Sequence, residues 1–280
     1  MIASGRYGAV NNISQLQNWN LEWTMTDDAQ ANSYTRAGKM RDSSIQDWTG
    51  GGTWLGSSFP SMEGFNFTGY CAPSNGVYGT AGTTYSGRAL WNSVTISGDV
   101  SSGGRINVQM QWGGDGALTV GSSAVTDTAN PDILMAMDCE ISFGDTELRW
   151  KSFNLNITND TQTLVDSGTN GWTARYAGIL DFTGSVTQAT DVHLDENGAL
   201  DTLLIKCGAL TVFELNYARV MSFSGLTVDP SSGAIIEATT NFGMAAHDDS
   251  GTLGSMTVLG TQIWPPALPQ NGAGNGETST

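Results

Sequence analysis

Apolar and polar residues alternate along several stretches of this chain. In residues 18–23, two tryptophans and a leucine occupy every second position, and two asparagines and a glutamate lie between them. Residues 153–157, 62–70 and 106–112 alternate in a similar way. Successive side chains of an extended chain point to opposite faces, so this period of two predicts β-strands with one buried face.

Two further strands are predicted over residues 45–53 and 179–187. Each follows a strongly polar stretch, 27–39 in one case and 160–170 in the other. Both polar stretches are too hydrophilic to be buried, and each is predicted to form a long loop or a hairpin. Long excursions from compact β-domains usually make contacts or carry function.

Residues 200–207 show a different spacing. Leu200, Leu203, Leu204 and Cys207 form an i, i+3, i+4 stripe, and Gly208 follows as a stop signal. This pattern predicts a short helix. The first half of the chain has no equivalent, because its residues 62–70 alternate as a strand does.

The sequence is internally duplicated. A shift of 134 residues lays 20–53 over 154–187 without a gap. In a second block, 94–98 lies over 221–225 and 106–113 lies over 236–243. The identical positions of the first block are Asn20/Asn154, Leu21/Leu155, Thr24/Thr158, Ser33/Ser167, Thr35/Thr169, Arg41/Arg175, Ile45/Ile179, Asp47/Asp181, Thr49/Thr183, Gly50/Gly184 and Thr53/Thr187.

This order of blocks predicts two copies of one domain. We expect a first domain over residues 1–128 and a second over 129–264, separated by a polar stretch that contains Asn130-Pro131. Residues 265–280 are rich in Pro, Gly, Asn, Ser and Thr and are expected to form a flexible tail. The predicted fold is mostly β: two tandem sandwich-like or barrel-like domains, each with at most one flanking helix and one long polar loop.

Composition and charge narrow the function. The net charge is −16, and residues 131–280, with 5 basic and 18 acidic side chains, carry −13 of it. Such a surface argues against gripping nucleic acid, because phosphate binding relies on Lys and Arg. It is compatible with a surface that DNA slides past, although an acidic surface also serves solubility alone. We expect no secretory signal and no membrane-spanning segment.

No catalytic, cofactor or metal site is predicted. His193 and His247 match no metal-ligand spacing, and Asp248-Asp249 is expected to be a solvated turn. No nucleophile elbow, phosphate-binding loop or dinucleotide motif occurs. The three cysteines form no Cys-x-x-Cys pair and suggest idle or buried thiols in a reducing compartment.

The nine tryptophans are assigned mainly to the core. Trp19, Trp23, Trp48 and Trp112 align with Phe153, Ile157, Phe182 and Phe242, and exchange among large apolar residues is typical of core positions. The remaining candidates for exposure, which would favour glycan binding, are Trp54, Trp91 and Trp264.

An arginine and an aspartate recur at the same spacing in both halves: Arg41 with Asp47, and Arg175 with Asp181. One interpretation is an exposed pair in each half, worth ~0–1 kcal/mol. The other is a contact across a domain interface, where bidentate geometry specifies docking. The sequence does not decide between them.

Several short motifs occur in a characteristic order. They are Gly5-Arg-Tyr-Gly8-Ala-Val10, Trp19-Asn-Leu21 with Phe153-Asn-Leu155, Trp172 through Gly178 and Asp181 to Gly184, and the strand ends Trp112-Gly113 and Phe242-Gly243. Together they resemble the tail tube proteins of long-tailed bacteriophages, over most of 1–120 and 140–260. The first half departs from the pattern, since Gly38 stands in the place of Trp172.

The resemblance implies a virion structural protein rather than an enzyme. Six such domains would form a ring whose inner strands join into a barrel, so two domains per chain imply homotrimeric, pseudo-sixfold rings stacked into a tube. DNA would pass through the lumen without specific binding, and other tail proteins would bind at the tube ends. Assembly would take place in the bacterial cytoplasm, without membrane or cofactor. The alternative is a capsid-decorating or glycan-binding β-module.

Overall fold

The structure is a computed structural model of the 280-residue chain. It describes residues 8–11, 16–30, 40–55, 57, 65–71, 81–101, 103–124, 133–189, 198–225, 237–245, 247 and 250–264. The predicted boundary between residues 128 and 129 and the predicted tail 265–280 lie outside these ranges.

The described chain is almost entirely β-structure, as the alternating pattern predicts. One 3₁₀ turn, η1 (Ala136–Asp138), is its only helical element. The strands are β1 (Gly8–Val10), β2 (Leu16–Gln30), β3 (Met40–Trp54), β4 (Phe65–Cys71), β5 (Ala81–Asp99), β6 (Asn107–Gly114), β7 (Thr119–Ala124), β8 (Cys139–Phe143), β9 (Thr146–Leu148), β10 (Trp150–Leu164), β11 (Ala174–Ala189), β12 (Leu200–Cys207), β13 (Leu210–Ser224), β14 (Glu237–Met244), β15 (Met256–Val258) and β16 (Thr261–Trp264).

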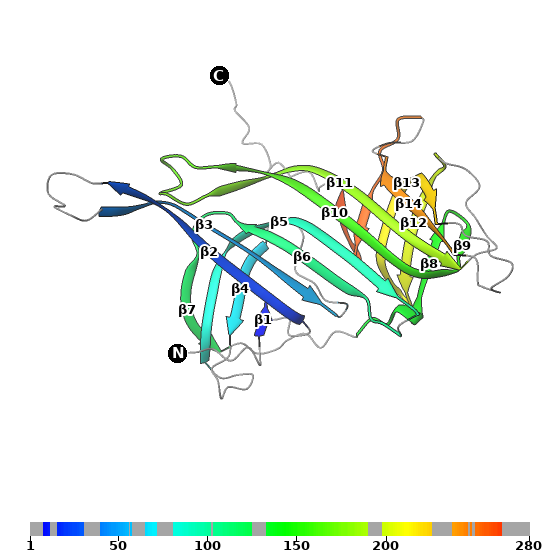
Figure 1. The fold of residues 1–280 in the computed structure, drawn as a ribbon, viewed down its shortest axis with the longest axis horizontal. Coiled ribbons are helices and arrows are strands. Elements are labelled where there is room, and N and C mark those ends of the chain that lie inside the picture. The colour runs from blue at the N-terminus through cyan, green and yellow to red at the C-terminus, as the bar shows by residue number, and fades with distance from the viewer. Residues whose placement is uncertain are drawn as a thin grey trace, which may run out of the picture.

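All strands belong to one antiparallel sheet (Figure 1). Its central path runs β2-β3-β6-β5-β10-β11-β14-β13, so each half of the chain contributes four neighbouring strands. The halves are joined edge to edge, because β5 pairs with β10. Strands β4 and β7 pair with the far part of β5, and β12 and β15 pair with that of β13; β1, β8, β9 and β16 extend these four strands.

Strand pairing repeats between the halves. Thr163 faces Arg175 in the β10–β11 hairpin, and Ala29 faces Arg41 in the β2–β3 hairpin, 134 positions earlier in each strand (163 − 29 = 175 − 41 = 134). Both hairpins also have register shifts at equivalent places. Seven strands of the first half have a counterpart in the second, and the pairings among the seven are equivalent within each half: β1/β8, β2/β10, β3/β11, β4/β12, β5/β13, β6/β14 and β7/β15.

One part of the sequence alignment needs correction. Val94 pairs with Met110 in the first half, and Phe223 pairs with Thr240 in the second. Since Met110 and Thr240 are equivalent, the counterpart of Val94 is Phe223 and the shift is 129 residues (223 − 94), two more than the alignment of 94–98 with 221–225 gave. A two-residue offset keeps every side chain on the same face, so alternation alone cannot detect it.

The helix predicted over 200–207 is wrong. These residues form strand β12, which pairs with β8 on one side and β13 on the other. Leu203 and Ile205 are fully buried. The segment also alternates with a period of two, and neighbours on both sides supply the hydrogen bonds that a helix would supply internally. β12 is the counterpart of β4, which explains why the first half has no helix either.

The predicted polar excursions are hairpins in their described parts. β10 continues through residues 160–164, the chain turns in 165–173, and β11 returns. The β2–β3 ladder continues in the same way to Gln30 opposite Met40. Figure 1 shows this hairpin projecting beyond the body of the molecule. Residues 31–39 lie outside the described residues.

The hydrophobic core contains more tryptophan than predicted. Trp48 and Trp112 are buried, which confirms their assignment to the core. Trp54 and Trp91 are buried as well, so the exposure considered for them is wrong. Trp54 faces Val108 across the β3–β6 ladder, on the core side of the sheet.

The prediction of idle thiols is wrong for two of the three cysteines. Cys139 and Cys207 face each other on β8 and β12, with their Cα atoms 4.1 Å apart, and form a disulfide. Sequence spacing could not reveal the pair, because 68 residues separate them and the pairing of β8 with β12 brings them together. Cys71 remains a free thiol.

Candidate assembly site

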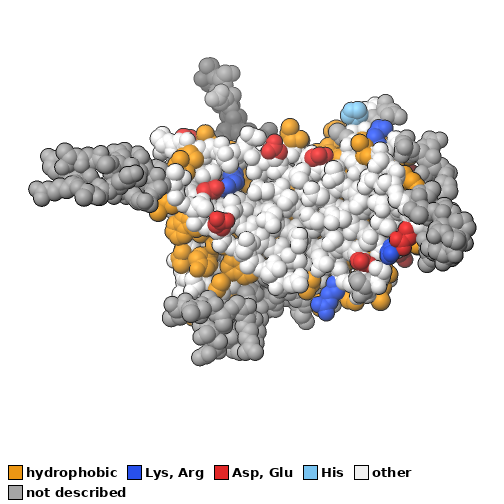
Figure 2. Space-filling view, viewed as in Figure 1, with side chains coloured by type: hydrophobic (Ala, Val, Ile, Leu, Met, Phe, Trp, Pro, Cys, Tyr) orange, Lys and Arg blue, Asp and Glu red, His pale blue; other side chains and the backbone are white. Residues whose placement is uncertain are grey.

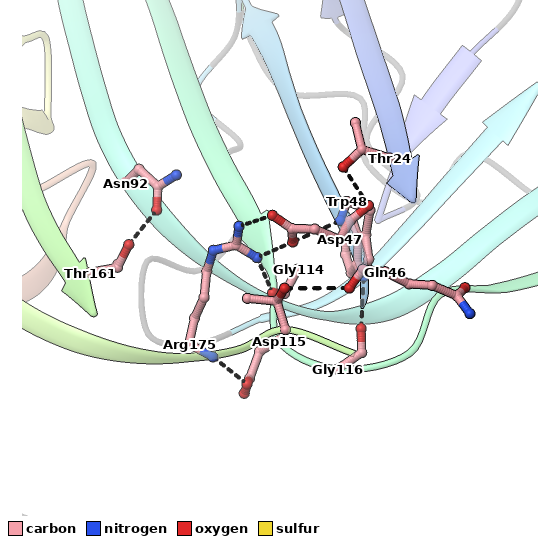
Figure 3. Close-up of polar contacts among 11 residues, drawn as sticks. Thr24, Gln46, Asp47, Trp48, Asn92, Gly114, Asp115, Gly116, Thr161 and Arg175 are labelled. Atoms are coloured by element: carbon pink, nitrogen blue, oxygen red, sulfur yellow. Dashed lines mark hydrogen bonds and ion pairs between the residues drawn. The ribbon is translucent and has the colours of Figure 1, made fainter. Parts of the chain in front are cut away.

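The two halves are fastened by an ion pair at one end of the β5–β10 junction. Arg175 on β11 donates Nη1 to Asp47 Oδ1 and Nη2 to Asp47 Oδ2, both at 2.7 Å (Figure 3). The Arg175 side chain is 6% exposed and that of Asp47 is 30% exposed. A bidentate pair this far from water restricts both distance and orientation, so it specifies how the halves meet.

Gly114 and Asp115 of the first half also bind Arg175. Its Nη1 also donates to the Gly114 carbonyl, and its backbone N–H donates to Asp115 Oδ1 at 2.9 Å. Asp115 in turn pairs with Arg88 at 3.2 Å. The Arg175 guanidinium therefore has both an anionic partner and a neutral acceptor, which a buried cation needs.

The chain before Arg175 is bound to the first half through its backbone. Gln46 donates its N–H to the Gly171 carbonyl at 2.7 Å and accepts from the Thr173 N–H at 2.9 Å. Gly116 donates to the Thr173 carbonyl at 2.9 Å. The turn that precedes β11 thus docks as a short added strand beside β3.

Glycine makes room for this arrangement. A Cβ on Gly113 would fall on the guanidinium of Arg175, so a side chain is sterically excluded there. Gly116 has a φ of +90°, in the left-handed region where only glycine is unstrained. Its carbonyl accepts a hydrogen bond from the Trp48 indole N–H at 2.9 Å.

An aromatic stack flanks the ion pair. Trp23 on β2 and Trp172 lie with ring centroids 5.9 Å apart and planes 27° from parallel. Trp23 is 50% exposed, so its predicted core assignment is wrong. It lies near the outer edge of the sheet, where β2 pairs with β3 alone among the described strands.

The β5–β10 ladder forms the rest of the junction. It pairs residues 93–99 with 152–158. Side chains reinforce it: Asn159 donates to the Trp91 carbonyl at 3.1 Å, Thr95 donates to Asn156 at 3.2 Å and Thr161 donates to Asn92 at 3.0 Å. Asn159 is buried, so its amide must be hydrogen-bonded to avoid a desolvation cost.

The four residues that the duplication marked, Arg41, Asp47, Arg175 and Asp181, do not form two equivalent pairs in the described structure. Arg175 meets Asp47 of the other half rather than Asp181 of its own, so the interpretation as an exposed pair within one half is wrong for Arg175. Asp181 is exposed, and its carboxylate accepts the neighbouring Phe182 N–H, as Asp47 accepts that of Trp48. Arg41 lies in β3, and its side chain lies outside the described part of the structure.

The sheet face opposite the core is polar, and the charges on it are mostly acidic. Its charged members along the central path include the acids Glu22, Asp47, Asp99, Asp160, Asp181 and Glu237; Asp47 pairs with Arg175, and Glu237 pairs with Lys151. In Figure 2, the middle of the molecule carries only scattered charges. The uncharged polar members include Asn18, Asn20, Thr24, Thr49, Thr53, Ser93, Thr95, Ser97, Asn107, Gln109, Gln111, Ser152, Asn154, Asn156, Thr158, Thr183, Ser185, Thr187, Ser222, Ser224, Thr239 and Asn241.

Other candidate chemistry finds little support in the described residues. They contain no group of three metal-ligating side chains and no helix able to span a membrane. His247 lies in an isolated bridge with Leu253, whereas His193 and Asp248-Asp249 lie outside the described residues. Burial raises the pKa of the Cys71 thiol, which disfavours its reactive thiolate.

Sequence reasoning missed several residues of this site. Asp115, Gly114 and Asn159 carry no repeated signal, because the second half has Ala245 and Met244 in place of the first two and the first half has Met25 in place of Asn159. Gly113 did carry one, since Gly243 is its aligned counterpart. A glycine retained at equivalent ends of two strands could have indicated a close approach at that point.

No protein-family model matches the chain, and no curated protein is similar to it in sequence.

Proposed function

We propose that this chain is a virion structural protein, the subunit of a bacteriophage tail tube, which acts by self-assembly rather than catalysis. Copies would join into rings, and rings would stack around a lumen through which DNA passes. With two equivalent halves per chain, three chains would complete a pseudo-sixfold ring.

The observation that carries this proposal is the edge-to-edge junction of the two halves. β5 and β10 pair across it, and their counterparts β13 and β2 lie at the two ends of the central path. A junction that joins unlike edges can repeat, and repetition closes into a ring when the rotation allows it. Closure would also pair the open edges of β2 and β13, which removes an aggregation hazard at these two strands.

The polar face supports the same proposal. If the sheet closes with its core outward, this face lines the lumen. Uncharged Ser, Thr, Asn and Gln with several acids offer phosphates few cations, and Arg175 and Lys151 are already paired with Asp47 and Glu237, so counterion release would hold DNA there only weakly. The net charge of −16 adds a general repulsion toward DNA.

Negative-stain electron microscopy over a concentration series, together with the mass in solution, tests the proposal. Rings or stacked tubes with a central hole and a threefold mass are expected. A monodisperse monomer at every concentration would refute it.

A capsid-decorating or glycan-binding module is the second candidate. The half-exposed Trp23, stacked on Trp172, offers an aromatic surface of the kind that sugars stack on. Glycan-array binding that is lost in Trp23→Ala, by a chain that never polymerises, would favour this candidate over the tube.

A further inference from the structure

At each end of the central path lies an edge that no described strand pairs with. These two edges are the counterparts of the edges of β10 and β5, which pair with each other inside the chain. β2 pairs with β3 alone among the described strands, and residues 222–224 of β13 pair with β14 alone. Their counterparts, β10 and residues 93–95 of β5, pair with each other. Each open edge is therefore equivalent to an edge that is paired at the internal junction.

The internal ladder predicts the register between these two edges. Inside the chain, Asn156 faces Thr95 and Thr158 faces Ser93. Replacing β10 by β2 (156 − 134 = 22) and β5 by β13 (95 + 129 = 224) places Glu22 opposite Ser224. The same substitution places Thr24 opposite Ser222. All four of these β2 and β13 residues are exposed, so no described part of the chain covers these positions.

Apolar side chains are exposed along both edges. Trp23 is 50% exposed and Met25 is 57% exposed on β2, and Met221 is 60% exposed on β13. At the internal junction, the counterparts of Trp23 and Met25 are Ile157 and Asn159, which are 0% and 8% exposed. Pairing of the two edges would bury the apolar residues in the same way, which is favourable.

A groove equivalent to the surroundings of Arg175 lies beside β13. It is a groove of about 540 Å³ that includes Asp181, Phe182, Gly243 and Met244. These residues are the counterparts of Asp47, Trp48, Gly113 and Gly114, the residues around Arg175.

In this groove, the flexible side chain of Met221 lies against Gly243, as Arg175 lies against Gly113 at the internal junction. A Cβ on Gly243 would lie 3.0 Å from Cγ of Met221, whereas a Cβ on Gly113 would meet Arg175. Among the described side chains, none forms an ion pair with Asp181. The counterpart of Arg175 is Arg41, whose backbone faces Ala29 as that of Arg175 faces Thr163.

We propose that the groove at Asp181 and the adjoining edge of β13 bind a second copy of this chain, whose β2 extends the sheet and whose Arg41 pairs with Asp181. The contact joins unlike surfaces, so each chain offers one of each and assembly propagates in one direction. This inference deepens the proposed function, since it names the surface through which a ring would form.

Charge exchange tests the ion pair in the full-length chain. Arg41→Asp and Asp181→Arg each place like charges together at the contact, and each is expected to raise the concentration needed for association at least about tenfold, since one lost charged pair costs more than 1.4 kcal/mol. The double variant restores opposite charges and is expected to recover association. Association is measured by sedimentation velocity, and thermal unfolding confirms that each variant is folded.

Cysteine crosslinking tests the register independently of affinity. Glu22→Cys with Ser224→Cys is expected to give oxidant-dependent ladders of linked chains. Asn20→Cys with Ser222→Cys is the matched control, four residues out of register or about 13 Å, and is expected to give none. The unsubstituted chain controls for its own cysteines.

The outcomes separate this inference from the proposed function. Rings that form equally well in both single charge variants, with no ladder from the 22/224 pair, would overturn the docking site and leave the tube proposal standing. Ladders and charge rescue in a chain that forms only short linear oligomers would support the docking site and count against the tube. A chain that neither associates nor crosslinks would overturn both.

Discussion

Replacing Asp47 by Asn removes the only anionic partner that the described structure gives to a deeply buried guanidinium. The amide keeps the shape of the carboxylate and one acceptor, but Arg175 loses one charge-assisted hydrogen bond and the neutralising charge. Breaking a fully buried pair costs about 3–5 kcal/mol. Because the Asp47 side chain is 30% exposed, water offsets part of this, and we expect a loss of about 2 kcal/mol.

Asp181→Asn is the matched control, because Asp181 is the equivalent residue without an ion pair among the described side chains. It should change the free energy of unfolding by less than about 0.5 kcal/mol. Both variants are compared by thermal and urea unfolding in dilute solution, after the mass confirms a monomer, since self-association would add apparent stability. A loss of about 2 kcal/mol corresponds to a fall of roughly 4–8 °C in the melting temperature.

Equal stability of the two variants would refute the reasoning. It would mean that the Arg175 guanidinium is solvated or held well enough by the Gly114 carbonyl alone. The ion pair would then contribute no more than a surface pair does, and the halves would be joined by the β5–β10 ladder.

Three further predictions concern other parts of the molecule. Reducing the Cys139–Cys207 disulfide should lower the free energy of unfolding by about 4 kcal/mol, the chain-entropy value for a separation of 68 residues. Urea unfolding with and without reductant measures this difference. Gly113→Ala should destabilise the chain by about 1–3 kcal/mol through overpacking, and Gly243→Ala by less, because Met221 can move aside; urea midpoints compare them. Burial raises the pKa of Cys71, so the folded state favours its neutral thiol and loses that advantage as pH rises through the raised pKa; alkylation at pH 8 should be several-fold slower in the folded chain than in urea.

The strands were predictable because alternation is a local property that burial on one face imposes directly. The helix prediction failed at Leu200–Cys207, where eight residues fit both periods. Pairing with β8 and β13 on either side stabilises the strand over the helix, and β8 lies about 60 residues earlier in the sequence. The same dependence on distant partners concealed the disulfide and the two-residue offset in the second repeat block.

The candidate site was predictable in part, because duplication marked Arg41, Asp47, Arg175 and Asp181 as a set. Which arginine meets which aspartate was open on sequence alone. The geometry of an extended strand excludes a contact between Arg175 and Asp181 of the same strand. Six residues of strand separate them, or about 20 Å, which exceeds the reach of one side chain. An arginine and an aspartate so placed on one strand must find partners on other strands.

The two junctions of the proposed ring differ in chemistry, and their difference follows from covalent linkage. The halves of one chain meet at high effective concentration, so their junction needs geometric specificity more than affinity, and it has the polar residues Asp115 and Asn159. At the junction between chains the counterparts are Ala245 and Met25. Association between separate chains must offset the loss of translational and rotational freedom, and apolar burial is its main source of affinity. Divergence of the copies in this direction is what a subunit needs when it folds first and assembles afterwards.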